Sequence, residues 1–487
     1  MTNPMHSSKY TGRAVLAAAL LSAAGLAACN QDKLLTVATP DVVLPQDISG
    51  PAALPSAYAA AISDFQVGYA GGYGNGAPAL DLNEGIGQMT ALLSDEFLNA
   101  ETFSTRVEVD RRATDDNNQT TLQTFQDIQR SRSTSDLVAS RFRQFLPDDP
   151  RGAEVQALAA YTLVLMGEAY CNGVPTSVVN ADGSFTYGAP QTGNQLFTTA
   201  LAKFDSAIAV ATAAGADGVE ALNLARIGKA RTLIDLNRYA EADAAVAAVP
   251  SGFNYSIQHS ENTGRQQNAI FSYNYLERRF TVGNQEGTNG LPFVASGDPR
   301  VPTFRNPLNS GVGFDGETPL FLTTKYPERK APTPLAIGAE ARLIQAEAAL
   351  KAGNLVTFLA MLNAARANAP TYTATGATTE QPLPKPAALT AADIPATAAG
   401  RENLLFRERA LTLYLTSHRL GDLRRLISQY GRNSESVFPT GPYNPGSASK
   451  AGTVYGTDVN LPIPAEEENN PQYAVAPHCI NRLAAFQ

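Results

Sequence analysis

The sequence predicts a mostly α-helical fold in which pairs of helices carry long loops. Three observations predict it. Segments with apolar residues at helical spacing recur along the chain, and two of them break at a short turn and then resume. Segments rich in Gly, Pro, Asn and Tyr separate them. The composition of the 487 residues, 44% hydrophobic and 17% charged, is that of a globular protein and excludes collagen, coiled coils and wholesale disorder.

The N-terminus has the pattern of an export signal. Two basic residues precede the uncharged stretch 14–28, which ends in small residues. The ending, Leu26-Ala27-Ala28-Cys29, is similar to the lipobox of bacterial lipoproteins, in which the cysteine thiol receives the lipid. We therefore expect 1–28 to be a signal peptide and Cys29 to be lipidated, so that acyl chains hold the protein on a membrane surface. An ordinary signal peptide with an incidental cysteine is the alternative.

Two further cysteines are expected to form a disulfide bond. With Cys29 lipidated, Cys171 and Cys479 remain as an even pair in an oxidising compartment. In the chain-entropy model a bridge that closes so long a loop contributes about 4–5 kcal/mol. Two unpaired thiols are the alternative. Three cysteines in all are too few for a zinc ribbon or a disulfide-dense scaffold.

We expect residues 29–487 to form a single domain built on helix pairs. The pairs are predicted at about 154–214, 220–250 and 336–368, where apolar residues keep helical spacing on both sides of a break. In the middle pair, Ala230 and Ala242 are small residues where two helices would cross closely. This arrangement resembles a tetratricopeptide unit, and three units are enough for a short helical-repeat scaffold.

Long segments without helical signal lie between these pairs. The largest, about 251–334, is dense in Gly, Pro, Asn and Tyr, and similar segments lie at 41–76, 371–399 and 434–477. Loops of this length in a compact domain are normally functional or well packed on a scaffold. We therefore expect the loop-rich region 251–334 to carry ligand-binding insertions.

The segment ERALTLYLTSHRLGDLRR, which begins at Glu408, resembles the C-terminal signature helix of the SusD/RagB family. The positions that match are Glu408, Arg409, Leu413, His418, Arg419, Asp422, Leu423 and Arg425. The positions that depart are Ala410, Thr412, Thr416, Ser417 and Leu420. Other motifs agree in order: a G-V-P turn at 173–175, D-P-R at 298–300, and L-P-I-P at 461–464 followed by N-P at 470–471. The signature helix and closing segment together span 401–487.

The resemblance implies a SusD-like fold and a function in nutrient uptake. Proteins of this family are outer-membrane lipoproteins that face the cell exterior. They bind a nutrient, often an oligosaccharide, and deliver it to a SusC-like TonB-dependent outer-membrane transporter as its lid. The family is not catalytic and needs no cofactor. The resemblance therefore implies a carbohydrate-binding protein with a transporter partner.

Two loop regions have the side chains that sugar capture requires, namely aromatic faces and planar polar groups. The candidate ligand-binding residues are Tyr69, Tyr73, Asn75, Asp95, Asn99, Tyr273, Tyr275 and Arg278. For each tyrosine the alternative is that it packs its loop onto the scaffold. The chain has no Trp, the strongest stacking side chain, so a peptide, a polyphenol-like molecule and a small glycan all stay open as ligands.

Other functional classes find less support in the residues. The net charge of −8 and the lack of a basic tract argue against nucleic acid. Histidines 259, 418 and 478 are too widely spaced for a metal motif, and no nucleophile elbow or phosphate loop occurs. We expect the charges of the signature helix to form a buried ion-pair network, with His418 packed or hydrogen-bonded inside it. The alternative function is that of a periplasm-facing tetratricopeptide lipoprotein that binds protein partners as a scaffold.

Overall fold

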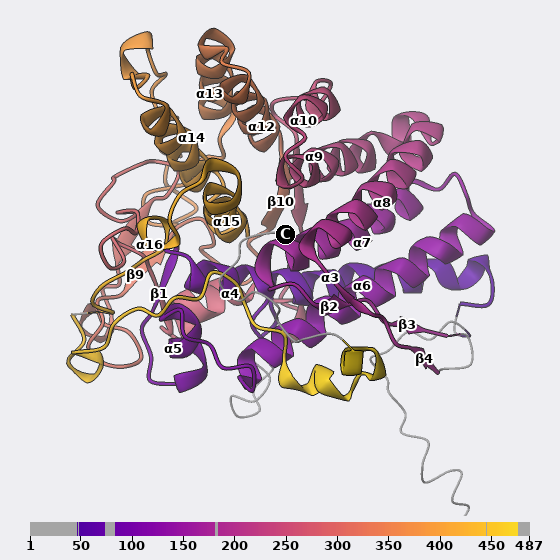
Figure 1. Ribbon diagram of the computed structural model, residues 1–487, viewed down its shortest axis with the longest axis horizontal. Coiled ribbons are helices and arrows are strands. Elements are labelled where there is room, and N and C mark those ends of the chain that lie inside the picture. Colours follow the sequence, from indigo (N-terminus) through magenta and orange to yellow (C-terminus); the bar gives the residue numbers. More distant parts are fainter. Residues whose placement is uncertain (1–45, 47, 74–82, 181–183, 445, 476–487) are drawn as a thin grey trace, which may run out of the picture. The chain divides into compact units, whose positions relative to one another are not determined.

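The computed structural model describes residues 46, 48–73, 83–180, 184–444 and 446–475. Its contacts divide the chain into Met1–Val43, which lies outside these residues, and Leu44–Gln487. The predicted signal peptide, Cys29, Asn75 and Cys479 also lie outside them. The described part is mostly helical with short strands, which confirms the predicted fold class (Figure 1).

The helices before the repeats pack against one another and against the first repeat helix. These are α3 (Leu54–Ala70), α4 (Ile86–Leu93), α5 (Ser104–Asp110) and α6 (Gln119–Phe145). The long helix α6 packs against α3 and against the first repeat helix, α7 (Pro150–Ala169). Its N-cap is Asn118, whose side chain accepts from the backbone N–H groups of Thr120 and Thr121.

Each of the three predicted helix-pair segments contains two helices. The pairs are α7 with α8 (Gly193–Ala213), α9 (Val219–Asp235) with α10 (Tyr239–Val246), and α12 (Gly338–Lys351) with α13 (Leu355–Asn368). Contacts run α7 to α8, α8 to α9, α9 to α10, α10 to α12 and α12 to α13, so neighbours along the chain are neighbours in the stack (Figure 1). This is the tetratricopeptide-like arrangement that the sequence predicts.

Small residues allow the repeat helices to approach closely. Ala230 and Ala242 are fully buried, as expected at a close crossing. Gly228 on α9 lies under aromatic rings: a Cβ atom there would stand 2.3 Å from Cζ of Phe204 and 2.8 Å from Cζ of Tyr161. Helix α8 is long and apolar enough to cross a membrane by length and composition, and one of its sides packs against α7 and α9 in the stack.

The signature segment forms two helices with a break between them. They are α14 (Ala398–Thr412) and α15 (Arg419–Tyr430), followed by the short α16 (Ser434–Val437). Leu415 and Ser417 in the break have left-handed φ angles of 52° and 60°, which end α14. Buried groups hold this conformation: the Leu415 N–H donates to Oε1 of Glu96 at 2.7 Å, and the Leu415 carbonyl accepts from Tyr326 at 2.9 Å.

The charges of α14 and α15 form the buried network that the sequence analysis expects. Asp422 accepts from Arg409 and from Arg425, each at 2.8 Å. Arg419 binds both carboxylate oxygens of Asp95, at 2.6 and 2.8 Å, and Nε2 of His418 lies 2.9 Å from Glu340. All of these side chains are buried. The network therefore fixes the two helices to the repeats and to the loop after α4.

The strands form two-stranded antiparallel ladders. Before the loop-rich region lie β1 (Phe97–Asn99), β2 (Val174–Pro175), β3 (Val178–Val179), β4 (Phe185–Thr186) and β5 (Pro190–Gln191). Inside it or at its edge lie β6 (Asn254–Ile257), β7 (Phe280–Val282), β8 (Thr303–Arg305), β9 (Phe321–Thr323) and β10 (Thr333–Ile337). The pairs are β1 with β7, β2 with β5, β3 with β4, β6 with β10 and β8 with β9. The β1–β7 ladder ties the loop after α4 to the loop-rich region.

The closing segment returns to the end of α7. The Leu461 N–H donates to the Ala169 carbonyl at 2.8 Å, and the Cys171 N–H donates to the Leu461 carbonyl at 3.0 Å. Further along, the hydroxyl of Tyr473 donates to the Gly173 carbonyl. Cys171 is disulfide-bonded, and its partner lies outside the described residues. The pairing of Cys171 with Cys479 stays a prediction. The hydrogen bond from Tyr473 to Gly173 supports it, because it brings the closing segment near Cys171.

Candidate ligand-binding site

Four of the predicted ligand-binding residues are buried. Tyr69 and Asp95 are 1% exposed, and Asn99 and Tyr273 are 0% exposed. Each has a structural partner instead. The Tyr69 hydroxyl donates to the carbonyl of Pro334 at 2.8 Å, Asp95 is bound by Arg419, and the Asn99 side chain accepts from the Glu101 N–H at 3.0 Å. In this structure these side chains present no surface to a ligand, and we remove them from the candidate site.

Tyr69, Asp95 and Asn99 are buried for a shared physical reason. The loop backbones cannot satisfy all of their own N–H and C=O groups, so these buried side chains form the missing hydrogen bonds. Asp95 illustrates this, because its Oδ2 accepts from the Leu291 N–H at 2.8 Å. Tyr273 is held by side chains instead: its ring stacks on Phe280 at a centroid distance of 4.9 Å, and its hydroxyl lies 3.5 Å from Arg106. The packing alternative given for the tyrosines therefore describes Tyr69 and Tyr273.

Three predicted residues keep some exposure: Tyr73, Tyr275 and Arg278. The Tyr275 ring stacks on Phe271 at 4.8 Å and its hydroxyl donates to the Thr323 carbonyl at 2.9 Å, so it mainly packs its loop. The Tyr73 hydroxyl donates to Oε1 of Glu277 at 2.9 Å. The structure thus brings together the two loop regions that the sequence analysis singled out, at Tyr73 and Glu277.

Beside this junction lie two exposed phenylalanines that the sequence analysis missed. Phe103 is 48% exposed and Phe314 is 45% exposed. Their ring centroids are 6.3 Å apart with an interplanar angle of 37°. The guanidinium of Arg279 lies 4.9 Å from the Phe103 centroid and 4.8 Å from the Phe314 centroid. We call Phe103, Phe314 and Arg279 the aromatic platform.

Backbone hydrogen bonds join the three loops that form the platform. The Ala100 N–H donates to the Arg279 carbonyl at 2.7 Å, and the Phe314 N–H donates to the Arg278 carbonyl at 2.9 Å. Gly313, next to Phe314, is required for the close approach, because a Cβ atom there would stand 2.4 Å from Cβ and 2.6 Å from the carbonyl oxygen of Ala100. The platform is therefore fixed by main-chain geometry.

Ion pairs beneath the platform hold its cation in place. Arg279 pairs with Glu101 at 2.5 Å and with Glu277 at 3.3 Å. Arg106 pairs with Glu101 at 3.2 Å and with Glu84. Burial raises the pKa of Glu84 despite the charge of Arg106. A guanidinium fixed against two aromatic faces contributes cation–π stabilisation and keeps both rings from turning inward.

Arg278 stands at the edge of the platform in a strained backbone conformation. Its φ angle is 54°, in the left-handed region that an Arg residue seldom adopts. Its side chain makes one long hydrogen bond, 3.4 Å to the Val312 carbonyl, and no acidic side chain in the described part of the chain pairs with it. The half-buried Arg278 guanidinium is thus available to a ligand beside the rings.

The platform and its edge provide the chemistry for binding a hydroxyl-rich ligand. Two aromatic faces suit the apolar face of a sugar ring, while the Tyr73 hydroxyl, the Glu277 carboxylate and the Arg278 guanidinium suit its hydroxyl groups. The Glu277 side chain is 24% exposed. In the described residues no group of three or more His, Cys, Asp or Glu side chains is placed to hold a metal ion.

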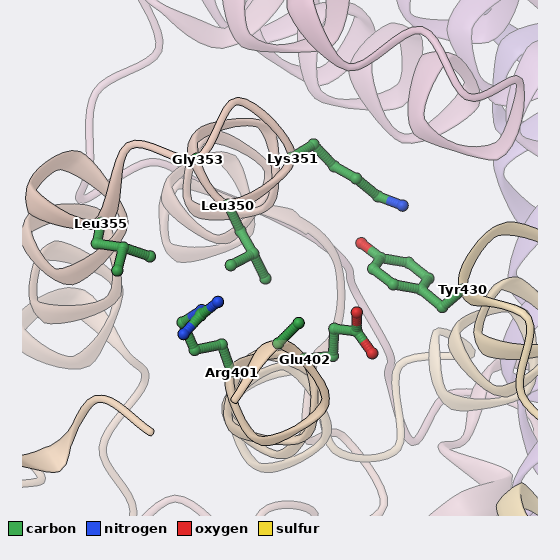
Figure 2. A pocket seen from close by; sticks show the side chains of 8 residues that line it. Leu350, Lys351, Gly353, Leu355, Arg401, Glu402 and Tyr430 are labelled. Carbon is green, nitrogen blue, oxygen red and sulfur yellow. The ribbon is translucent and has the colours of Figure 1, made fainter. Parts of the chain in front are cut away.

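Two hollows in the described surface lie elsewhere. One, of about 240 Å³, is lined by Leu122, Phe125, Gln126, Tyr187, Pro464, Glu466, Glu467, Asn469 and Asn470. The other, of about 250 Å³, lies among helix ends (Figure 2) and is lined by Leu350, Lys351, Gly353, Leu355, Ala398, Arg401, Glu402 and Tyr430. Neither is lined by a residue of the aromatic platform or by a residue predicted to bind ligand.

Comparison with known proteins identifies the fold. No family model and no curated protein matches the sequence. Among solved structures, a SusD/RagB family protein from Bacteroides thetaiotaomicron VPI-5482 matches with a TM-score of 0.60 and 15% identity, over 91% of this chain and 98% of that one. A SusD-like carbohydrate-binding protein from Bacteroides fragilis NCTC 9343 matches with a TM-score of 0.59 and 15% identity, over 87% and 99%. A laminarin-binding SusD-like protein matches with a TM-score of 0.57 and 14% identity, over 87% and 98%.

Proposed function

We propose that this chain, which has the fold of the SusD/RagB family, captures a glycan on the aromatic platform and delivers it to a TonB-dependent transporter. The observation that carries the proposal is the exposed pair Phe103 and Phe314, held in place by Arg279. Exposing two large apolar rings is unfavourable unless a ligand covers them, so their fixed exposure at a junction of loops favours binding.

The comparisons support a glycan as the ligand. Two of the similar structures are described as carbohydrate-binding and as laminarin-binding. The platform has the side chains for this ligand class, because stacking on two rings and hydrogen bonds to Tyr73 and Arg278 suit a sugar better than a fully apolar molecule. The oligosaccharide expectation is therefore retained as a proposal, with laminarin as the first glycan to test.

The platform supports capture more than catalysis. Its carboxylates are held in ion pairs: Glu101 pairs with Arg279 and Arg106, and Glu277 pairs with Arg279 and accepts from Tyr73, with lone pairs left to accept from a ligand hydroxyl. A general acid or nucleophile needs a carboxylate that is free to exchange a proton or attack. We propose that the protein is not an enzyme, in keeping with the non-catalytic role that the family resemblance implies.

The N-terminal sequence supports a location at a membrane surface. The lipobox-like sequence ending at Cys29 supports lipidation. We propose that acyl chains anchor the protein at the outer membrane, facing the cell exterior, with a SusC-like TonB-dependent transporter as its partner. In this arrangement the platform presents the ligand to the transporter, for which the protein acts as the lid.

The ligand proposal is tested by measuring affinity for soluble glycans, beginning with laminarin. We expect Phe103→Ala and Phe314→Ala each to weaken binding about tenfold, which corresponds to about 1.4 kcal/mol and the upper range for an aromatic contact. Phe185→Ala is the matched control, because Phe185 is 61% exposed and lies outside the platform. Glycan binding that both platform variants retain in full would refute the site.

The partner proposal needs a separate experiment. Purification of the tagged protein from its own membranes in mild detergent, followed by mass spectrometry, should recover a β-barrel TonB-dependent transporter in stoichiometric amount. Recovery of periplasmic or envelope-assembly proteins without such a barrel would favour the alternative function, a periplasm-facing scaffold. The two experiments are independent, since glycan binding does not require the transporter.

A further inference from the structure

A second hollow lies where two helices of the repeat scaffold meet the two signature helices. The hollow of about 250 Å³ shown in Figure 2 is formed by the last turn of α12, the first residue of α13, the first turns of α14 and the last residue of α15. We call it the helix-end pocket. It shares no residue with the aromatic platform, so it requires its own explanation.

Two cationic side chains line the helix-end pocket, and neither forms an ion pair with a carboxylate of the described chain. Nη1 of Arg401 donates to the carbonyls of Pro395 at 3.1 Å and Ala396 at 2.7 Å. Its Nε atom is buried and has no hydrogen-bond partner in the structure. A buried guanidinium N–H without a partner is costly, so the Arg401 side chain keeps hydrogen-bonding capacity that its two carbonyl contacts do not use.

Lys351 approaches the pocket from the other side (Figure 2). Its ammonium group lies 3.5 Å from the ring centroid of Tyr430 and 5.0 Å from that of Tyr239, and it donates to the Gln429 carbonyl at 3.2 Å. Partial burial lowers the pKa of Lys351. Its direct contacts are aromatic faces and one carbonyl, and the carboxylates of Glu347 and Glu402 attract the ammonium without forming an ion pair with it.

The acidic residue of the pocket does not cancel these charges. Glu402 is paired with Arg432 at 2.5 Å, so its charge is already balanced. Arg401 is the fourth residue of α14, close to the positive end of the helix dipole, where a cation is unfavourable. The pocket therefore keeps an excess of positive charge, which a bound anion would stabilise.

The rest of the lining is apolar. Leu350 and Leu355 contribute side chains beside Arg401, and Leu355 is 39% exposed (Figure 2). A ligand that fills the pocket therefore needs an anionic group and an apolar part. A singly charged carboxylate matches the single guanidinium, that of Arg401, which lies beside the two leucines.

From these contacts we propose that the helix-end pocket binds a carboxylate with an apolar substituent, with Arg401 as the main donor and Leu350 and Leu355 beside the substituent. Two sources have this chemistry, namely the C-terminal residue of a polypeptide and a free organic acid. The site adds a ligand to the scaffold side of the protein and is independent of the proposed capture of glycans.

Calorimetric titration of the full chain with N-acetyl-L-leucine tests the proposal, and N-acetyl-L-leucinamide is the uncharged reference. We expect saturable binding of the acid and none of the amide. Arg401→Gln should weaken binding about tenfold or more, the loss expected for a hydrogen bond to a charged group. Arg407→Gln, at an exposed position on the same helix, should leave it unchanged. Lys351→Gln is the second variant if Arg401→Gln lowers the melting temperature.

The same titrations distinguish the two sources and can overturn the proposal. Tighter binding of acetyl-Ala-Ala-Leu than of N-acetyl-L-leucine assigns a polypeptide end, and equal binding assigns a small organic acid. Three results overturn the site: no saturation by either acid, equal binding of the amide, or full binding by both the Arg401 and Lys351 variants. Displacement of the acid by equimolar inorganic phosphate overturns the choice of carboxylate. Glycan affinity, measured alongside, should not change in the Arg401 variant.

Discussion

Asp422 provides a sharp test of whether the signature helices have a structural role or bind ligand. Its carboxylate lies between two guanidinium groups, accepting from Arg409 and from Arg425 at 2.8 Å each. The three side chains are between 1% and 3% exposed. Asp422→Asn keeps the size of the side chain and removes its charge, so it tests the electrostatic role alone.

The expected loss of stability depends on the ion pairs that Arg409 and Arg425 keep when Asp422 loses its charge. Arg425 keeps Glu347 and, at 3.6 Å, Asp235, whereas Arg409 keeps Glu347 at 3.9 Å. A buried guanidinium that loses its partner costs about 3–5 kcal/mol. We therefore expect the free energy of unfolding to fall by about 3 kcal/mol or more, a large share of the 5–15 kcal/mol typical of folded proteins.

The pH dependence of this loss has a definite sign. Burial alone raises the pKa of Asp422, but the charges of Arg409 and Arg425 outweigh it and hold that pKa below its ordinary value. A group with a depressed pKa in the folded state contributes stability above its unfolded pKa and loses it as the pH falls through the folded pKa. The difference between wild type and Asp422→Asn should therefore be full above about pH 4 and shrink in stronger acid.

Urea denaturation at pH 7, followed by circular dichroism, measures the effect. Asp205→Asn is the control, because the Asp205–Lys229 pair has the same charges at 2.6 Å but Asp205 is 58% exposed. We expect the control to lose no more than about 0.5 kcal/mol. A loss below about 1 kcal/mol in Asp422→Asn would refute the reasoning on buried pairs. A loss of glycan affinity at unchanged stability would instead make the signature helices part of the binding site.

Two further predictions concern other buried groups. If Cys171 and Cys479 are bridged, alkylation of the unfolded, unreduced protein should find no free thiol. Cys479→Ser should expose one thiol and lower the free energy of unfolding by about 4 kcal/mol. A free Cys479 thiol in the wild type would refute the pairing. Burial, aided by the charge of Glu286, raises the pKa of Asp110 to about 8. The stability that Asp110 contributes is thus fully present below its unfolded pKa of about 4 and is lost as the pH rises to about 8, so melting temperatures should fall across this range and fall less in Asp110→Asn. An equally steep fall in the variant would contradict this.

The helical scaffold could be predicted from the sequence because its signals are local. Helical periodicity, turn residues and small residues at crossings all lie within about 30 residues of each other, as in the pair that contains Ala230 and Ala242. The resemblance treats the segment from Glu408 as a single signature helix, whereas the structure has a break between α14 and α15. This break depends on Glu96 and Tyr326, which contact Leu415 from segments far away in the chain.

The candidate site was harder to predict because burial in long loops is not local. Asp95 and Asn99 are residues of the types that bind sugars. In the structure, however, Asp95 binds Arg419, and Asn99 accepts from the Glu101 N–H. The sequence does contain a signal for Phe314. This large apolar residue stands between Gly313 and Asp315 in a glycine-rich turn, where an apolar side chain is unusual and therefore suggests a binding function. Phe103 has no comparable signal, since its exposure depends on Arg279 and Phe314.

The buried polar groups and the exposed rings depend on each other, because the first make the loops rigid and the rigid loops hold the second in place. Loops without regular structure hold a rigid surface only if their polar backbone groups are satisfied, and here buried side chains such as Asn99 and Asp95 contribute to that. Because these polar side chains are buried, other residues such as Phe103 and Phe314 form the exposed surface. Arg279 and backbone hydrogen bonds fix the positions of these two rings. A ligand then binds without having to order the loops, which lowers the entropic cost of capture.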